Sequence, residues 1–261
     1  MHPFPTVRAR ALSVITLAIA AGLMCQAPAF AETTTPSTPP TPQLSSISKL
    51  SSTNGVEDGG AQVVISGSNF VGVTAVAFGT SPATSFTASS PTSITAVAPA
   101  LKAGTYQLAV TNEAGTTVAA KYTVRTFAAE VLRLVNEARG VTRKCGGSKY
   151  KATGPLRWDS TLAKVATAHS RDMADHDYFS HDSRNGTSAF QRMKKAGYRY
   201  SSAGENIAAG FRTPASVVRA WLKSPGHCKN LMNRSYDELG VGFATGGTYG
   251  TYWTQDFGNP R

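Results

Sequence analysis

Cysteine is scarce in this sequence, with three residues in 261. We expect Cys25 to be removed with an N-terminal leader, which leaves only Cys145 and Cys228. No CxxC motif occurs, which argues against a zinc ribbon held by four thiolates. In an oxidising compartment two cysteines favour one disulfide, with free or metal-binding thiols as the alternative. If they pair, closing a loop of about 80 residues stabilises the fold by about 4 kcal/mol.

Long apolar runs are also rare. Ala11–Leu23 is the one such stretch, and it is too short to cross a bilayer comfortably. Two arginines precede it and the small-x-small pattern Ala29–Ala31 follows it, so residues 1–31 are predicted to be a signal peptide cleaved before Glu32. A retained membrane anchor is the alternative. The mature chain is then expected to have no transmembrane segment and to be extracytoplasmic, in a periplasm, in a cell wall or secreted.

Charge is sparse in the first part of the mature chain and abundant in the second. Residues 32–125 hold four basic and four acidic side chains, whereas residues 126–261 hold twenty basic and eleven acidic ones. A basic surface suits anionic partners such as wall polymers or phospholipid headgroups, although a merely solvated surface has the same composition. No basic strand is interleaved with aromatic residues, so we expect no nucleic-acid partner.

Composition divides the mature chain into three parts. Residues 32–43 are rich in Thr and Pro and are predicted to be an extended linker. Over residues 44–125, β-forming residues two positions apart alternate with Gly and Pro turn signals, which predicts a β-sandwich. Residues 126–261 show helical spacing first and a terminal antiparallel strand pair last, at Leu239–Phe243 and Thr251–Phe257. This order predicts a layered α/β domain.

Local capping signals mark four helices in the second domain. The first runs from Phe127 to Gly140. The second begins at Asp159 or Ser160 and the third at Thr187 or Ser188. The fourth begins at Thr213-Pro214 and ends at Ser224-Pro225-Gly226. We interpret this tripeptide as a helix stop.

Candidate functional side chains concentrate in the second domain. His181 follows the second helix and His227 follows the fourth, so both are expected in connecting segments, where sites are often built. Glu205 stands between a glycine and an amide. Two imidazoles and a carboxylate can hold Zn²⁺ with an open position, or act as acid, base and orienting group without a metal. Spacing alone does not show that they converge. His169 lies on an apolar helix face and is interpreted as a core histidine.

Signals for covalent catalysis are lacking. No GxSxG motif occurs, and Ser170 and His169 are helix neighbours whose side chains point about 100° apart. Only Glu205 is a convincing candidate carboxylate, whereas glycoside hydrolysis needs two. We therefore favour a binding protein over an enzyme; an enzymatic activity is expected to be hydrolytic, with Glu205 as its base.

The first domain resembles the IPT/TIG family. The resemblance rests on Gly60–Phe70, Val76–Gly79, Ser93–Pro99 and Gly104–Asn112. It implies an all-β immunoglobulin-like sandwich that serves as a spacer or an interaction module.

The second domain resembles the CAP superfamily of cysteine-rich secretory and pathogenesis-related proteins, most of all its bacterial branch. The segments that carry the resemblance include Leu156–Asp159, Ala168–Met173, Tyr178–His181, Gly204–Gly210, Trp221–Asn230 and Tyr252–Gly258. The resemblance implies an α/β/α sandwich whose central cleft holds a divalent metal in several members. The whole chain is thus expected to be multidomain, an immunoglobulin-like sandwich followed by an α/β/α sandwich.

The resemblance also implies site residues. His181 and Glu205 match the first cleft histidine and glutamate of the family. Ser224 stands where a second glutamate is expected and Tyr252 where a second histidine is expected, so His227 and Asp256 are the candidate substitutes. A metal, zinc or another divalent ion, would then be bound by His181 and His227.

Three functions follow from these expectations. The first is a binding module that holds a metal, a lipid-like molecule or a cell-envelope ligand in the His/Glu cleft. The second is a metal-assisted hydrolase of envelope polymer or protein. The third is adhesion at the cell surface through the first domain.

Overall fold

The computed structural model describes residues 41–261 of the chain. The predicted signal peptide and most of the predicted linker lie outside the described residues. Within residues 41–261, no helix combines the length and the apolar character that crossing a bilayer requires.

The first domain is built from strands alone. They are β1 (Ser46–Leu50), β2 (Asn54–Val56), β3 (Gln62–Ser68), β4 (Ala75–Phe78), β5 (Ser81–Pro82), β6 (Ser85–Ser90), β7 (Ser93–Val97), β8 (Gly104–Asn112) and β9 (Gly115–Arg125). One sheet has the order β1-β3-β7-β6 and the other β2-β9-β8-β4-β5. Alternate residues of both sheets, such as Val63, Ile65, Leu108 and Val110, are buried between them. This arrangement confirms the predicted β-sandwich.

The second domain combines five helices with a mixed sheet. Its helices are α1 (Phe127–Arg139), α2 (Ser160–Asp175), α3 (Ala189–Lys195), α4 (Pro214–Lys223) and α5 (Pro225–Leu231). Its strands are β10 (Arg143–Cys145), β11 (Ser148–Tyr150), β12 (Arg157–Trp158), β13 (Tyr200–Ala209), β14 (Glu238–Gly246) and β15 (Gly250–Pro260). Four of them form a sheet of order β12-β14-β15-β13, so β13 is an edge strand.

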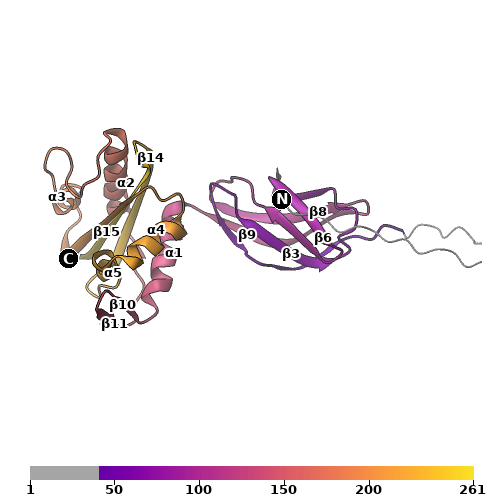
Figure 1. Ribbon diagram of the computed structural model, residues 1–261, viewed down its shortest axis with the longest axis horizontal. Helices are drawn as coiled ribbons and strands as arrows, with labels where there is room; N and C mark the ends of the chain where they lie inside the picture. The colour runs from indigo at the N-terminus through magenta and orange to yellow at the C-terminus, as the bar shows by residue number, and fades with distance from the viewer. Residues whose placement is uncertain (1–40) are drawn as a thin grey trace, which may run out of the picture. The chain divides into compact units, whose positions relative to one another are not determined.

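Helices cover both faces of this sheet. On one face α2 and α3 pack around Leu162, Met193 and Tyr198, whereas α1, α4 and α5 pack with Trp253 and Phe257 on the other (Figure 1). The predicted α/β/α sandwich is therefore confirmed, and the predicted terminal strand pair forms its centre as β14 and β15.

The predicted helix caps are confirmed by backbone hydrogen bonds. Asp159, Ser188 and Thr213 each accept from a backbone N–H in the first turn of α2, α3 and α4. The interpretation of Ser224-Pro225-Gly226 as a stop is incomplete, because Pro225 also begins α5. His227 consequently lies in the first turn of a helix and not in a connecting segment, since a proline that cannot continue one helix is well suited to start the next.

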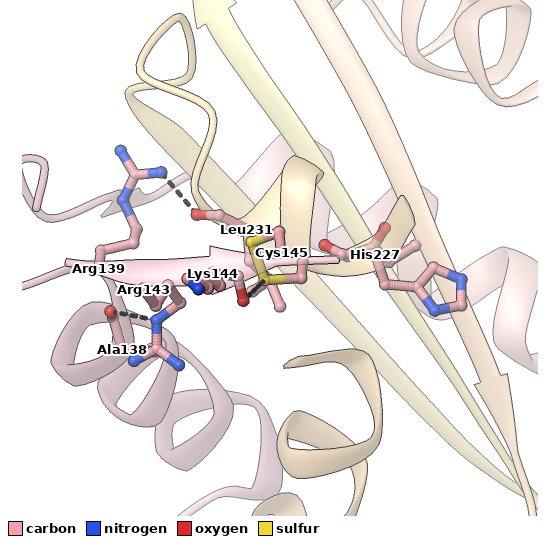
Figure 2. The surroundings of a disulfide bond; sticks show 9 residues. Ala138, Arg139, Arg143, Lys144, Cys145, His227 and Leu231 are labelled. Atoms are coloured by element: carbon pink, nitrogen blue, oxygen red, sulfur yellow. Dashed lines mark hydrogen bonds between the residues drawn. A yellow bond between two sulfur atoms is a disulfide. The ribbon is translucent and has the colours of Figure 1, made fainter. Parts of the chain in front are cut away.

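Short helix α5 is held by covalent and polar bonds (Figure 2). Cys228 forms a disulfide with Cys145 on β10; the two cysteines are 83 positions apart in sequence and their Cα atoms are 5.4 Å apart. The buried guanidinium of Arg139 donates to the carbonyl oxygens of Leu231 at 2.8 Å and Asn233 at 2.9 Å. Burial lowers the pKa of Arg139 to about 10, which still leaves it charged at neutral pH. The predicted disulfide is thus present, and it ties α5 to the β10–β11 hairpin.

Two glycines of β14 allow α2 to lie directly against the sheet. A Cβ atom on Gly240 would stand 2.1 Å from the backbone nitrogen of Ala163, and one on Gly242 would stand 2.2 Å from the carbonyl carbon of Ala166. Both obstacles are helix backbone, which cannot rotate away. This close packing fixes the distance between α2 and the sheet, and with it the position of the loop that follows α2.

We predict that Gly242→Ala lowers the free energy of unfolding by at least about 2 kcal/mol, because α2 must move off the sheet. Gly154→Ala is the control, since no atom lies within 4 Å of its added Cβ. It should change stability by less than about 0.5 kcal/mol. Urea unfolding followed by tryptophan fluorescence measures both, and equal stabilities of the two variants would contradict this account of the α2 packing.

Candidate functional site

The candidate site lies along the free edge of β13. Strand β13 pairs with β15 on one side only. Side chains of neighbouring helices donate hydrogen bonds to the backbone carbonyl oxygens on its free edge. Trp221 donates from Nε1 to the carbonyl oxygen of Ile207 at 3.1 Å, and Asn230 donates from Nδ2 to the carbonyl oxygen of Glu205 at 3.1 Å. The loop after α2 and helix α5 both approach this edge, which brings His181 and His227 to it from opposite faces of the sheet.

Glu205 is the buried centre of the site. Its side chain is only 3% exposed, yet both carboxylate oxygens have cationic or imidazole partners. His181 donates from Nδ1 to Oε1 at 2.7 Å, and Arg192 donates from Nη2 to Oε2 at 2.6 Å. These hydrogen bonds offset the cost of burying a carboxylate. Because the side chain is almost fully buried and each oxygen already accepts a hydrogen bond, Glu205 is better suited to orient His181 than to contact a substrate.

Arg192 organises the loop that carries His181. In addition to Glu205, its guanidinium donates from Nη1 to the carbonyl oxygens of His181 at 2.9 Å and Thr187 at 3.0 Å. The side chain is 12% exposed and comes from α3. Sequence analysis did not identify this residue, because on a short helix with several basic neighbours it resembles part of a solvated face.

The imidazole of His181 is held at one nitrogen and open at the other. Its side chain is 54% exposed, and Nδ1 is occupied by Glu205. A carboxylate accepts only, so Nδ1 carries a proton, while Nε2 has no hydrogen-bond partner among residues 41–261. This leaves a fixed ring with one nitrogen available to a ligand.

His227 is half-buried in the first turn of α5. Its pKa is lowered, first by burial and then by the positive charge of His181, so the neutral ring is favoured at pH 7. Asn206 holds its backbone, donating from Nδ2 to the His227 carbonyl oxygen at 3.2 Å, and accepts from Asn230 at 2.9 Å. In Figure 2 the imidazole of His227 points away from the disulfide.

Asp256 lies beside Glu205, on the neighbouring strand β15 of the same sheet. The two residues are direct partners in the β13–β15 register, Asp256 is fully buried, and neither of its carboxylate oxygens has a hydrogen-bond partner. Burial, followed by the negative charge of Glu205, raises the pKa of Asp256 well above its usual range. The structure therefore places Asp256 beside Glu205 but out of reach of a ligand in the cleft.

The predicted core histidine is confirmed. His169 is 1% exposed on α2, and its Nε2 lies 2.9 Å from the carbonyl oxygen of Ser180 in the loop that leads to His181. Burial lowers its pKa.

A hollow of about 380 Å³ opens beside His227. Its walls are mainly apolar and come from β13, α4, the start of α5 and three loops: Phe179, Ile207, Ala208, Ala209, Phe211, Ala220, Trp221, Ser224, His227 and Tyr249. Phe179 and Tyr249 are 44% and 53% exposed, and their ring centroids lie 5.9 Å apart. We call this hollow the edge pocket. Apart from Tyr249 at the rim, its polar lining residues are Ser224, the N-cap of α5, and His227 in the first turn of that helix, and we call these two residues its polar end.

A metal ion would find few protein ligands here. Among residues 41–261, no group of three or more His, Cys, Asp or Glu is placed to hold one. Glu205 is engaged by two donors, which leaves Nε2 of His181 and the ring of His227. A zinc site with three protein ligands does not fit this donor set.

We predict that Asp256→Asn becomes more stable relative to the parent protein as the pH rises. The unfolded Asp256 ionises above about pH 3.9, whereas the folded group does so only at higher pH, so the parent loses up to about 1.4 kcal/mol per pH unit in that interval. The amide that replaces the carboxyl in the variant has no such titration. Urea unfolding between about pH 4 and pH 8 measures the difference, with exposed Asp175→Asn as the surface control. A difference that stays constant with pH would contradict the burial of a raised-pKa carboxyl.

Comparison with known proteins gives both domains a family. The model of the cysteine-rich secretory protein family, CAP, matches residues 132–257, and the IPT/TIG domain model matches residues 45–125. The uncharacterized protein YkwD of Bacillus subtilis is 39% identical over 149 residues, which are 57% of this chain and 53% of the relative. The chain thus spans about half the length of that relative.

Two solved structures are similar in part. An extracellular SCP-domain protein from Bacillus anthracis is 25% identical with a TM-score of 0.44, over 78% of this chain and 58% of that one. An outer surface protein from Borrelia burgdorferi is 24% identical with a TM-score of 0.42, over 51% of this chain and 89% of that one. The family matches carry the assignment: the chain contains an IPT/TIG domain, residues 45–125, followed by a domain of the cysteine-rich secretory protein family, CAP, residues 132–257.

Proposed function

We propose that the CAP domain is an exported binding module that takes a lipid-like ligand into the edge pocket, with the polar end of the ligand at His227. The observation that carries the proposal is the edge pocket itself, an apolar hollow with one polar end on a domain surface. Sites for small molecules are commonly of this kind, mostly apolar with a few placed polar groups.

The walls of the pocket suit an apolar chain. Trp221 is fixed by its hydrogen bond to the carbonyl oxygen of Ile207, and the alanines of β13 leave the space that a larger side chain would fill. Phe179 and Tyr249 stand at the rim with roughly half of their surface exposed. Covering these rings with a ligand removes apolar surface from water, at about 25 cal/mol per Å².

The polar end of the pocket suits a hydroxyl, amide or carboxyl group. A neutral His227 offers one donor and one acceptor, and its lowered pKa favours that form at pH 7. His181 adds an imidazole nitrogen at the same strand edge. A divalent metal, if the ligand carries one, would have these two imidazoles as its protein ligands.

Export belongs to the proposal. Its support is the predicted signal peptide of residues 1–31, the disulfide between Cys145 and Cys228, and the descriptions of similar proteins as extracellular or outer-surface.

Hydrolysis is the second candidate, favoured by the pairing of His181 with Glu205. A carboxylate that fixes Nδ1 of an imidazole is the arrangement that prepares Nε2 to accept a proton from water. In that case His181 is the base and Glu205 the positioning residue, because the Glu205 carboxylate is buried and fully engaged. Hydrolysis of an envelope polymer that stops in His181→Ala while ligand binding persists would favour this function.

Adhesion through the IPT/TIG domain is the third candidate. Its support is a run without a single charged residue, from Gly59 to Leu101, which includes the Ser- and Thr-containing strands β3, β7 and β6 of one sheet. Envelope binding that is independent of the edge pocket and is lost on removal of residues 44–125 would favour it.

We predict that Ala220→Leu weakens binding of dansyl-undecanoic acid at least about tenfold, because the added side chain fills the edge pocket. Ala215→Leu is the matched control: it lies on the same helix and lines a separate hollow between α1 and α4. It should leave affinity within about twofold of the parent. Fluorescence titration measures both, and an unchanged affinity in Ala220→Leu would refute the assignment of the ligand to this pocket.

A further inference from the structure

Basic and acidic residues are strongly segregated in the CAP domain. Between Glu137 and Asp159 the chain has six basic residues and no acidic one, and between Glu205 and Asp237 it has five basic residues and again no acidic one. Nearly half of all Lys and Arg residues of the chain therefore lie in two acid-free stretches. Mixed surfaces normally intersperse the two signs, so this distribution requires an explanation.

The fold joins these two stretches. The disulfide between Cys145 and Cys228 links the β10–β11 hairpin of the first stretch to α5 of the second (Figure 2). The buried Arg139 adds its hydrogen bonds to Leu231 and Asn233, and Tyr150 packs against the disulfide. Side chains that are about 80 positions apart in sequence thus share one region of the surface.

We define the basic face by the charged side chains of this region. They are Arg143, Lys144, Lys149, Lys151, Lys229 and Arg234. All but the half-buried Arg143 are exposed, and none of the six forms a salt bridge within the part of the chain that the structure describes. Their charges are therefore available to a partner.

One pair in the hairpin is costly to the fold. Lys144 and Lys149 are direct cross-strand partners in the β10–β11 register. Like charges in that position destabilise a strand pair, and no carboxylate accompanies them in the hairpin. A bound anion would relieve this repulsion.

The basic face also contains a hollow of about 390 Å³ at the seam between hairpin and helix. It is lined by Tyr150, Lys229, Asn230, Met232, Asn233 and Arg234, so two cations and three polar side chains meet at one depression. Such a depression has room for a polar unit of a polymer between the flanking lysines.

Membrane lipid is the less suitable source of negative charge. A site that lies in the membrane interface needs large apolar side chains to insert between the headgroups. Strands β10 and β11 and helix α5 have no exposed large apolar side chain.

We propose that the basic face docks a linear phosphate-bearing polymer of the cell envelope, independently of the edge pocket. Lys144, Lys149 and Lys151 on the hairpin and Lys229 and Arg234 beside the hollow bind successive phosphates. Binding of this kind is electrostatic, tolerant of the polymer's repeating unit and strongly dependent on salt.

The test compares two variants of the full chain with equal net charge. The first removes five charges from the basic face: Lys144→Gln, Lys149→Gln, Lys151→Gln, Lys229→Gln and Arg234→Gln. The matched control removes five exposed charges elsewhere in the same domain, none of which forms a salt bridge in the described structure: Lys164→Gln, Arg171→Gln, Arg184→Gln, Lys195→Gln and Arg199→Gln.

Long-chain inorganic polyphosphate is the probe, and calorimetry measures its affinity. We expect the first variant to bind at least about tenfold more weakly than the parent and with a shallower salt dependence, and the control to stay within about threefold. Equal losses in the two variants would show that overall charge decides binding and would overturn the proposal, as would no loss in the first.

Two further measurements complete the test. Phosphatidylglycerol vesicles that bind the parent more tightly than polyphosphate does would overturn the choice of a polymer over a membrane. Thermal unfolding shows whether both variants fold, and dansyl-undecanoic acid titration should give parental affinity in both. A loss of polyphosphate binding with intact dansyl-undecanoic acid binding separates the basic face from the edge pocket.

Discussion

The carboxylate of Glu205 sits almost completely inside the protein, and the cleft is arranged around the need to compensate its charge. A buried, unpaired carboxylate is costly; here His181 and Arg192 each donate to one oxygen. His181 comes from the loop after α2 and Arg192 comes from α3. Their hydrogen bonds to the one carboxylate therefore fix this loop, the position of α3 and the orientation of the exposed His181 imidazole. The neighbouring Asp256 is fully buried without such partners, and burial, followed by the negative charge of Glu205, raises its pKa.

Helix α5 links the two proposed binding surfaces of the CAP domain. His227 at its start faces the edge pocket, and Lys229, two residues later, lines the hollow of the basic face. A helix of seven residues has little stability of its own. The disulfide, Arg139 and the amide of Asn230 supply the missing constraint from three directions. The same bonds therefore position both His227, which lines the edge pocket, and Lys229, which belongs to the basic face.

Much of this architecture was predictable from sequence because it depends on local signals. Asp159, Ser188 and Thr213 cap the helices at the positions where their side chains favour a cap. Strand β13 was not predicted, because its Ser, Ala and Gly residues carry little β-preference and it is a strand by pairing with β15. The start of α5 at Pro225 was missed for a related reason: the signal that ends α4 also begins the next helix. The role of Arg192 has no local signature at all, since it follows from the position of Glu205, thirteen residues away.

Imidazole ¹⁵N NMR of the full chain tests the central claim most directly, that the polar end of a ligand in the edge pocket meets His227. Undecanoic acid is titrated into the protein while the histidine side chains are observed, with exposed His176 as the internal reference. The account predicts that the ring resonances of His227 shift and saturate together with binding while those of His176 stay in place. Saturable binding that leaves the His227 resonances unmoved would contradict it.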